Sequence, residues 1–137
     1  MSEREAIDWD ALERAAERAR DKAYAPYSGY TVGAALLGED GNVYAGANVE
    51  NASYPMCLCA ERSAVAAAVF AGVRRFVAMA LSTKGSRAAA PCGACRQVLA
   101  EFPPSFPIVC TSAAGDRLET TVEELLPHRF DADYLDE

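Results

Sequence analysis

Strand-like apolar runs alternate with helical segments along this sequence of 137 residues, and the alternation constrains the fold more than any other feature. Helical spacing predicts helices at residues 8–23, 59–71 and 93–102, and a short last helix from Thr120 to Pro127. Short apolar runs predict strands at residues 30–37, 43–48, 75–82 and 108–111. Strands that alternate with helices form a sheet covered by helices on both faces, so the sequence predicts an α/β fold.

Turn and capping residues set the expected bounds of these elements. Asp8 is placed to cap the first helix, and Pro26 is expected to end it. Residues 38–42 are rich in turn formers, so the two strands that they join are expected to form a hairpin. A hairpin makes the sheet mixed rather than purely parallel. Thr120 and Glu123 match a capping box for the last helix.

Length and charge limit the classes of function. The length predicts a single domain over residues 1–137, with an acidic, loose tail at residues 131–137. The net charge of −7 argues against a nucleic-acid partner, because such affinity depends on neutralising phosphates. No apolar run approaches the roughly 20 residues that span a bilayer, and residues 1–5 do not resemble a secretory signal. We therefore expect a cytoplasmic protein with no membrane partner.

The cysteines carry the strongest chemical signal in the chain. The cytosol keeps thiols reduced, so clustered cysteines point to a metal or to catalysis rather than to disulfides. Cys92 and Cys95 form a Cys-x-x-Cys pair at the start of one predicted helix, and Cys59 starts another. Partial positive charge at helix N-termini favours the thiolate, which is the form that binds metal. Three thiolates suit Zn²⁺ and leave the fourth position for water, whose pKa zinc brings toward about 7.

The other cysteines and the histidine leave one structural alternative open. Cys57 is the candidate fourth thiol of a closed, purely structural zinc site. Cys110 lies in an apolar strand run and is predicted to be a buried small hydrophobe. His128, the only histidine, is distant in sequence from every cysteine and is predicted to lie at the surface.

Charged residues beside the cysteines complete the candidate site. Glu61 follows Cys59 by two residues and can act as a general acid and base beside a metal-bound water. A glutamate in the first turn of a helix is also favoured by the helix dipole alone. Arg62 and Arg96 can donate to thiolate sulfurs and offset their negative charge, or can be solvated helix charges.

Cys-Ala-Glu at residues 59–61, followed by Pro-Cys-x-x-Cys at residues 91–95, resembles the signature of the zinc nucleoside and nucleobase deaminases. Most members of that superfamily have His at the first ligand position, whereas this chain has Cys59. In this respect it is similar to the short, three-cysteine cytidine deaminases. Other segments resemble that family in the same order, at residues 25–28, 32–36, 48–54 and 125–130.

The resemblance implies both a fold and a reaction. The fold is a three-layer αβα sandwich with a mixed five-stranded sheet. Cys59, Cys92 and Cys95 would hold one Zn²⁺ per chain, and the activated water would attack C4 of cytosine. Glu61 would take the water proton, protonate N3 of the ring and help ammonia to leave. The expected reaction converts cytidine and deoxycytidine to uridine and deoxyuridine, for pyrimidine salvage.

The resemblance also implies roles for residues outside the cysteine motifs. Asn48 and Glu50 would hold the sugar hydroxyls, because residues two apart on a strand point the same way. Taken alone, their spacing favours polar residues that cap a strand edge. Tyr30 and Ala60 would contact the substrate, although the family commonly has Phe at the position of Tyr30. Family members of this length are homotetramers, in which Phe130 would reach the pocket of a neighbouring subunit.

Three other functions stay open. Relatives of the blasticidin deaminase type act on a cytosine-bearing antibiotic and share the zinc motifs, but lack the Asn-x-Glu-Asn segment at residues 48–51. A zinc-stabilised protein without catalysis would have no need of Glu61. A redox protein would use Cys92 and Cys95 free of metal.

Overall fold

The centre of the structure, a computed structural model that describes residues 6–136, is a five-stranded sheet. Its strands lie in the order β2-β1-β3-β4-β5. Their bounds are Val32–Gly38 for β1, Val43–Ala47 for β2, Phe76–Thr83 for β3, Pro107–Ser112 for β4 and Arg117–Thr121 for β5. Only β3 and β4 are parallel neighbours, so the predicted mixed sheet and its opening hairpin are confirmed.

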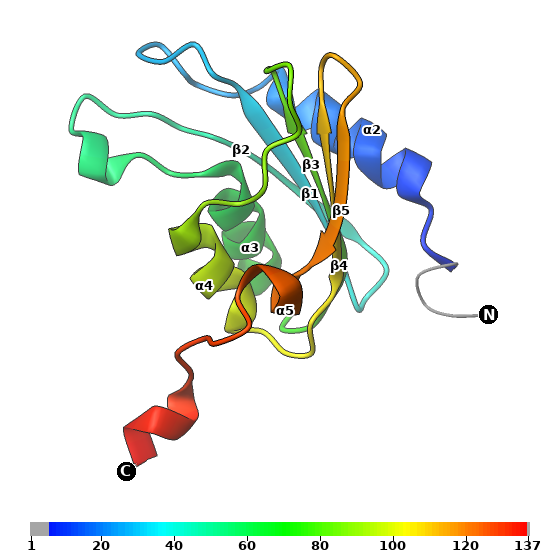
Figure 1. Cartoon of the computed structure of the whole chain (residues 1–137), viewed down its shortest axis with the longest axis vertical. Coiled ribbons are helices and arrows are strands. Elements are labelled where there is room, and N and C mark those ends of the chain that lie inside the picture. The colour runs from blue at the N-terminus through cyan, green and yellow to red at the C-terminus, as the bar shows by residue number, and fades with distance from the viewer. Residues whose placement is uncertain (1–5, 137) are drawn as a thin grey trace.

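Helices cover both faces of this sheet (Figure 1). The helix α2 lies on one face, and α3, α4 and α5 lie on the other. Their bounds are Trp9–Arg20 for α2, Ala60–Phe70 for α3, Gly93–Ala100 for α4 and Val122–Leu125 for α5, with short 3₁₀ helices at Tyr54–Met56 and Ala132–Asp136. The expected three-layer αβα sandwich is therefore confirmed. None of the helices in residues 6–136 is long and apolar enough to cross a bilayer.

Alternate residues of the central strands pack against the two helical layers, as the two-residue period of a strand requires. Ala35 of β1 and its neighbours on β3 pack against the buried side chains of Leu12 and Ala16 on α2. Leu36 of β1 and Met79 of β3 belong to the larger core on the opposite face. That core holds the first turn of α3, so the helix that bears the Cys-Ala-Glu motif is packed directly onto the sheet.

Two glycines allow helices to approach the sheet closely. A Cβ at Gly33 of β1 would lie 2.0 Å from the carbonyl oxygen of Ala16 on α2. A Cβ at Gly46 of β2 would lie 2.5 Å from the backbone nitrogen of Ala64 and 2.7 Å from the carbonyl oxygen of Ala60 on α3. Neither position has room for a side chain, so Gly46 sets how deep the start of α3 sits on the sheet.

The first helix is shorter than the prediction of residues 8–23. Its cap is confirmed, because the Asp8 side chain accepts the backbone N–H of Ala11. The helix ends at Arg20, well before Pro26. The reason is a tertiary pairing: Tyr24 donates its backbone N–H to Asn48 and accepts that of Glu50, which draws the chain out of the helix.

The C-terminal region also departs from the residue pattern. The strand β5 was not among the predicted strands, because its residues are mostly polar and exposed at the sheet edge. The capping box is displaced by one residue: Thr121, not Thr120, caps α5, and its side chain accepts the N–H of Glu124. The last helix is a single turn that ends at Leu125 rather than at Pro127.

Candidate metal centre and active site

Three cysteines meet where two helices begin. Cys59 is the N-cap of α3 and Cys92 is the N-cap of α4, while Cys95 lies in the first turn of α4 and is fully buried. Their sulfur atoms all lie within 4.8 Å of one another, and those of Cys59 and Cys92 are 3.9 Å apart. Four ligands at a Zn–S distance of about 2.3 Å place sulfurs about 3.8 Å apart in a tetrahedron. The three sulfurs therefore fit one zinc ion.

The remaining cysteines do not join this cluster. The Cys57 thiol accepts the backbone N–H of Asn51 at 3.3 Å, and Cys57 is not among the grouped ligands found in the described residues. The closed four-cysteine alternative thus has no support in the geometry. Cys110 is fully buried in β4, as predicted, and burial raises the pKa of its thiol to about 12. His128 is exposed, also as predicted.

Glu61 lies in the first turn of α3 and only 6% of it is exposed. Burial raises the pKa of its carboxyl above the usual value, and this effect outweighs the backbone N–H, the Cys95 thiol and the Arg62 charge, which lower it. A carboxyl that holds a proton more readily than usual, beside the cysteine cluster, is suited to take up and deliver a proton.

The two arginines next to the cysteines behave differently. The Arg62 guanidinium donates to the Cys59 sulfur and to the Cys57 carbonyl, both at 3.4 Å. Arg96 reaches no thiolate: it donates to the carbonyl of Pro91 at 2.7 Å and to that of Leu125 at 3.2 Å. Of the two arginines considered from sequence, Arg62 is the one whose charge lies against the sulfurs.

A cavity of about 390 Å³ opens beside the cysteines and brings together residues that lie far apart in the sequence. Its lining includes the expected site residues Tyr30, Asn48, Glu50, Cys59, Ala60, Glu61 and Cys92. Tyr30 is 41% exposed. The lining thus combines sulfur and a buried carboxyl with neutral and acidic polar groups.

Asn48 and Glu50 hold the backbone that leads into β1. The Asn48 amide accepts the N–H of Val32 and donates to the carbonyl of Tyr30, both at 2.8 Å. The Glu50 carboxylate accepts the N–H of Tyr27 at 2.9 Å and the N–H and hydroxyl of Ser28. These bonds, the Ser28 hydroxyl foremost, hold the pKa of Glu50 below its usual value. Both side chains are therefore fixed in the cavity wall.

Several residues that line the cavity were not predicted from the sequence as site residues. Ser28 lines the cavity and holds Glu50, and its only signal was its place in a segment that resembles the cytidine deaminases. Thr83, Ala89 and Ala90 reach the cavity from the end of β3 and the connection that follows it. Their small or common side chains gave no sign of a site.

Phe130 does not line the cavity of its own chain. It is 57% exposed, stacks on Tyr134 with ring centroids 5.4 Å apart, and its carbonyl accepts the Gln97 side-chain amide at 2.7 Å.

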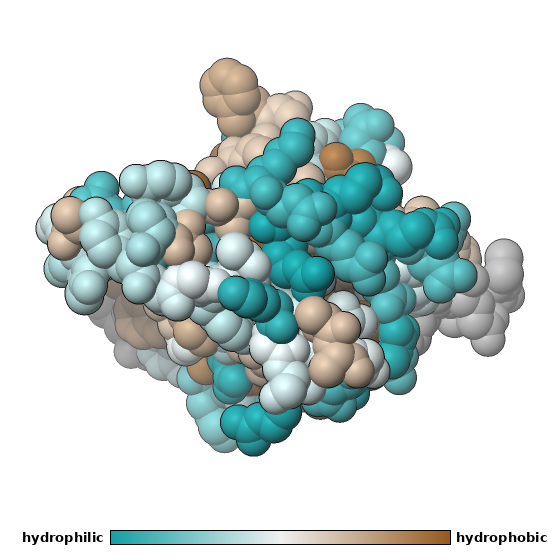
Figure 2. All heavy atoms as spheres, turned by 90° about the horizontal axis from the view of Figure 1, so that it is seen from above, coloured by the Kyte–Doolittle hydropathy of each residue, from teal (hydrophilic) through white to brown (hydrophobic). Residues whose placement is uncertain are grey.

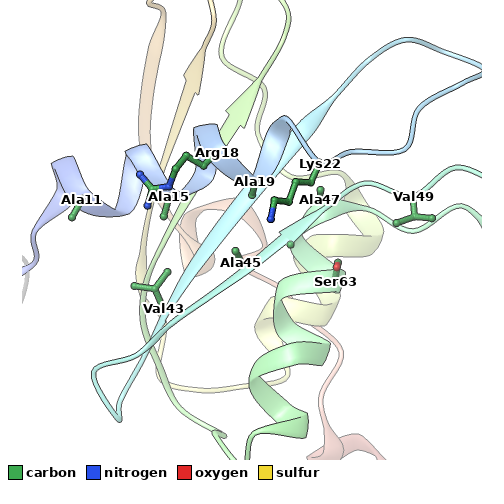
Figure 3. Close-up of a pocket in the computed structure, with 11 residues that line it drawn as sticks. Ala11, Ala15, Arg18, Ala19, Lys22, Val43, Ala45, Ala47, Val49 and Ser63 are labelled. Carbon is green, nitrogen blue, oxygen red and sulfur yellow. The ribbon is translucent and has the colours of Figure 1, made fainter.

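A larger cavity of about 750 Å³ lies between α2, β2 and the first turns of α3 (Figure 3). Alanine is its most frequent lining residue, and the charged lining residues are Arg18 on α2 and Lys22 just after that helix. Among the residues that the structure describes, no cysteine and no carboxylate lines this cavity. It therefore has neither the metal ligands nor the acidic group that the cavity beside the cysteines has. The view from above shows a largely hydrophilic surface with small hydrophobic groups scattered over it (Figure 2).

Comparison with known proteins agrees with the geometry. Residues 8–111 match the family described as the cytidine and deoxycytidylate deaminase zinc-binding region. A cytidine deaminase of Sporosarcina psychrophila is 48% identical over 130 residues, which are 94% of this chain and 96% of the relative. A cytidine deaminase of Halalkalibacterium halodurans is 46% identical over 132 residues, 96% of this chain and 100% of the relative.

Solved structures show the same likeness. The crystal structure of cytidine deaminase from Burkholderia pseudomallei superposes with a TM-score of 0.87 at 49% identity, over 90% of this chain and 100% of that one. The crystal structure of cytidine deaminase from Mycobacterium tuberculosis superposes with a TM-score of 0.78 at 40% identity, over 90% of this chain and 98% of that one. With a family match over most of its length and a cysteine cluster shaped for zinc, this chain belongs to the cytidine deaminase family.

Proposed function

We propose that this chain hydrolyses cytidine and deoxycytidine to uridine and deoxyuridine with release of ammonia, and that it serves pyrimidine salvage. The observation that carries the proposal is the single cavity in which the sulfurs of Cys59 and Cys92 and the buried carboxyl of Glu61 lie together. An open metal site with an adjacent acid and base is the equipment for adding water to a ring carbon and expelling an amine.

Cys59, Cys92 and Cys95 would hold the zinc, which when bound polarises a water molecule and makes it nucleophilic at neutral pH. Glu61 takes the proton of the attacking water and delivers it to N3 of the cytosine ring. The same carboxyl then assists protonation of the amino group as ammonia leaves, so one residue serves as base and as acid. Arg62 donates to the Cys59 sulfur and offsets part of the negative charge of the thiolates.

Asn48 and Glu50 would bind the sugar. Asn48 uses one amide N–H for the Tyr30 carbonyl, which leaves its second N–H to donate to a sugar hydroxyl. Glu50 accepts three hydrogen bonds, and a carboxylate has about four acceptor positions, so one is left for a hydroxyl donor. Because both side chains are already fixed to the backbone, little conformational entropy is lost when the sugar binds.

Tyr30 and Ala60 would contact the base. Ala60 is the first residue of α3, so its backbone N–H has no partner within the helix and can donate to an oxygen of the ring. The Tyr30 ring lines the same cavity and supplies apolar contact area.

The assembly that we propose is a homotetramer in the cytoplasm, in which Phe130 completes the cavity of a neighbouring chain. Its support is the exposure of large apolar side chains near the C-terminus and near the cavity, with Phe130 at 57%, Leu135 at 73% and Tyr54 at 68%. Apolar groups exposed to this degree are covered in many proteins by a partner. Light scattering on the purified chain tests the tetramer, and a monomeric mass would contradict it.

The test of the reaction combines metal analysis with a cytidine assay, in which the loss of absorbance is followed with and without a chelator. We expect one zinc per chain and activity that the chelator abolishes. Glu61→Gln should keep zinc and fold and lose about 10²- to 10⁴-fold in kcat, the usual contribution of a general acid and base. A fully active Glu61→Gln would contradict the proposed role of Glu61.

The same preparations separate the alternatives. Activity on a blasticidin-type antibiotic but not on cytidine would show that the substrate is a cytosine-bearing antibiotic. Zinc without any deamination would leave a purely structural metal. Metal-free Cys92 and Cys95 that cycle between thiol and disulfide would indicate a redox protein.

A further inference from the structure

One wall of the substrate cavity has almost no backbone hydrogen bonds of its own. Ala89, Ala90 and Cys92 line the cavity from the connection between β3 and α4. Within the part of the chain that the structure describes, no backbone group of residues 85–91 bonds to another backbone group. The methyl side chains of Ala89 and Ala90 offer few contacts of their own, so the wall is held by the packing of Ala88 and Pro91 on either side and by hydrogen bonds from other side chains.

Three side chains hold the connection from outside the cavity. The Asp116 carboxylate accepts the backbone N–H of Ala88 at 2.8 Å. The Ser112 hydroxyl donates to the carbonyl of Ser86 at 3.3 Å, and Arg96 donates to the carbonyl of Pro91 at 2.7 Å. The wall residues Ala89 and Ala90 thus lie between two charged anchors, Asp116 before them and Arg96 after them.

The sheet topology explains why Asp116 reaches the wall. The strands β3 and β4 are parallel, with Thr83 paired to Ser112 at their C-terminal ends. The connection after β3 and the turn after β4 therefore emerge side by side at the same end of the sheet (Figure 1). Asp116 lies on that turn, where the Ser112 hydroxyl accepts its backbone N–H at 3.0 Å. Asp116 does not line the cavity itself.

We infer that Asp116 is a positioning residue for substrate binding, which fixes the cavity wall at Ala89–Ala90 through the N–H of Ala88. The inference rests on the proposed function, because it takes this cavity to be the nucleoside site. The wall touches the bound ligand without taking part in proton transfer. Loss of the anchor therefore weakens binding of ground state and transition state alike, which appears in KM rather than in kcat.

Two variants of Asp116 test the anchor. Asp116→Ala removes the acceptor, whereas Asp116→Asn keeps an oxygen that can accept the N–H of Ala88. We expect Asp116→Ala to raise KM for cytidine about tenfold, with kcat and zinc content close to those of the wild type, because a wall that has lost a hydrogen bond to a charged group is correctly placed in a smaller fraction of molecules. Asp116→Asn should restore KM to within about threefold of the wild type. Because Asp116 is exposed, neither change should prevent folding.

Hydrogen exchange gives a readout that does not depend on activity. The amide of Ala88 should exchange faster in Asp116→Ala than in the wild type or in Asp116→Asn. Glu39→Ala, at an exposed acidic residue after β1, is the matched control and should change neither KM nor exchange at Ala88.

Any of three results overturns the inference: an unchanged KM in Asp116→Ala, an unchanged exchange rate at Ala88, or an Asp116→Asn variant as impaired as Asp116→Ala. A wild type that does not deaminate cytidine is a different failure. It contradicts the proposed function, while exchange at Ala88 still decides whether Asp116 holds the wall.

Discussion

The cavity has two sides that are built by different means. The sulfur side consists of the lining residues Cys59, Cys92 and Glu61 together with Cys95, which is fully buried and completes the sulfur cluster; all four lie at the starts of α3 and α4. The polar side consists of Ser28, Tyr30, Asn48 and Glu50, which lie on irregular chain before β1 and after β2. The sulfur side takes its geometry from packed helices, and the polar side takes its geometry from side chains that bond to backbone.

This difference teaches which changes should affect chemistry and which should affect binding. The start of α3 rests on β2 at Gly46 with no gap, so the sulfur side can move only if the core moves. Asn48 and Glu50 are each held by a few hydrogen bonds to residues 27–32. We therefore expect large losses of metal and kcat on the sulfur side, and smaller changes, mainly in KM, on the polar side.

The largest effect should come from a sulfur of the cluster. Cys95→Ala should lose most of its zinc and lower activity by about 10³-fold or more, because two thiolates leave the metal with too few protein ligands. Metal analysis and the cytidine assay measure both effects. Cys57→Ala is the matched control, since Cys57 lines the same cavity outside the cluster, and it should keep zinc. Loss of zinc from Cys57→Ala would instead support the closed site with four cysteine ligands.

On the polar side, Glu50→Ala should raise KM for cytidine about 10- to 100-fold, as expected for a lost hydrogen bond to a charged group, with kcat changed much less. Steady-state kinetics give both constants. Glu101→Ala, at an exposed acidic residue after α4, is the control and should behave as the wild type. A fall in kcat with KM unchanged would contradict a role of Glu50 in sugar binding and would indicate a role in the chemical step.

The smallest effect should be a shift in pH dependence. The Ser28 hydroxyl holds the pKa of Glu50 below its usual value of about 4.3, so the carboxylate stays ionised and binds as the pH falls toward that value. Ser28→Ala should raise this pKa, and KM should then begin to rise at a higher pH than in the wild type. The ratio of KM at pH 5 to KM at pH 7, with zinc content checked at each pH, measures the shift. Equal ratios in variant and wild type would show that Ser28 does not control the ionisation of Glu50.

The two sides of the cavity were not equally predictable from the sequence. The cysteines of the sulfur side could be predicted because helix starts and Cys-x-x-Cys spacing are local features of the sequence. The structure places all three sulfurs together. The Ser28–Glu50 and Asn48–Val32 contacts join residues that are far apart in the chain. Only the resemblance to a known family singled out Asn48 and Glu50, because no local pattern indicates such contacts.

The same distinction holds for the fold. The Asp8 cap and the hairpin of β1 and β2 follow from neighbouring residues and were predicted. The strand β5 has an exposed, polar sequence and exists because β4 offers it a pairing edge. The early end of α2 at Arg20 likewise depends on Tyr24 pairing with the segment that contains Asn48 and Glu50. Tertiary pairing thus accounts for the elements that residue patterns did not reveal.

Gly46 has a consequence for anyone who redesigns substrate preference. It lies on β2, outside the lining of the cavity beside the cysteines, so a mutational library aimed at the lining residues would pass over it. Yet any added methyl group there collides with the main chain at the start of α3, the helix that has Cys59 as its N-cap and carries Glu61 in its first turn. The map of positions that tolerate substitution in this enzyme is therefore not the map of positions that touch the ligand.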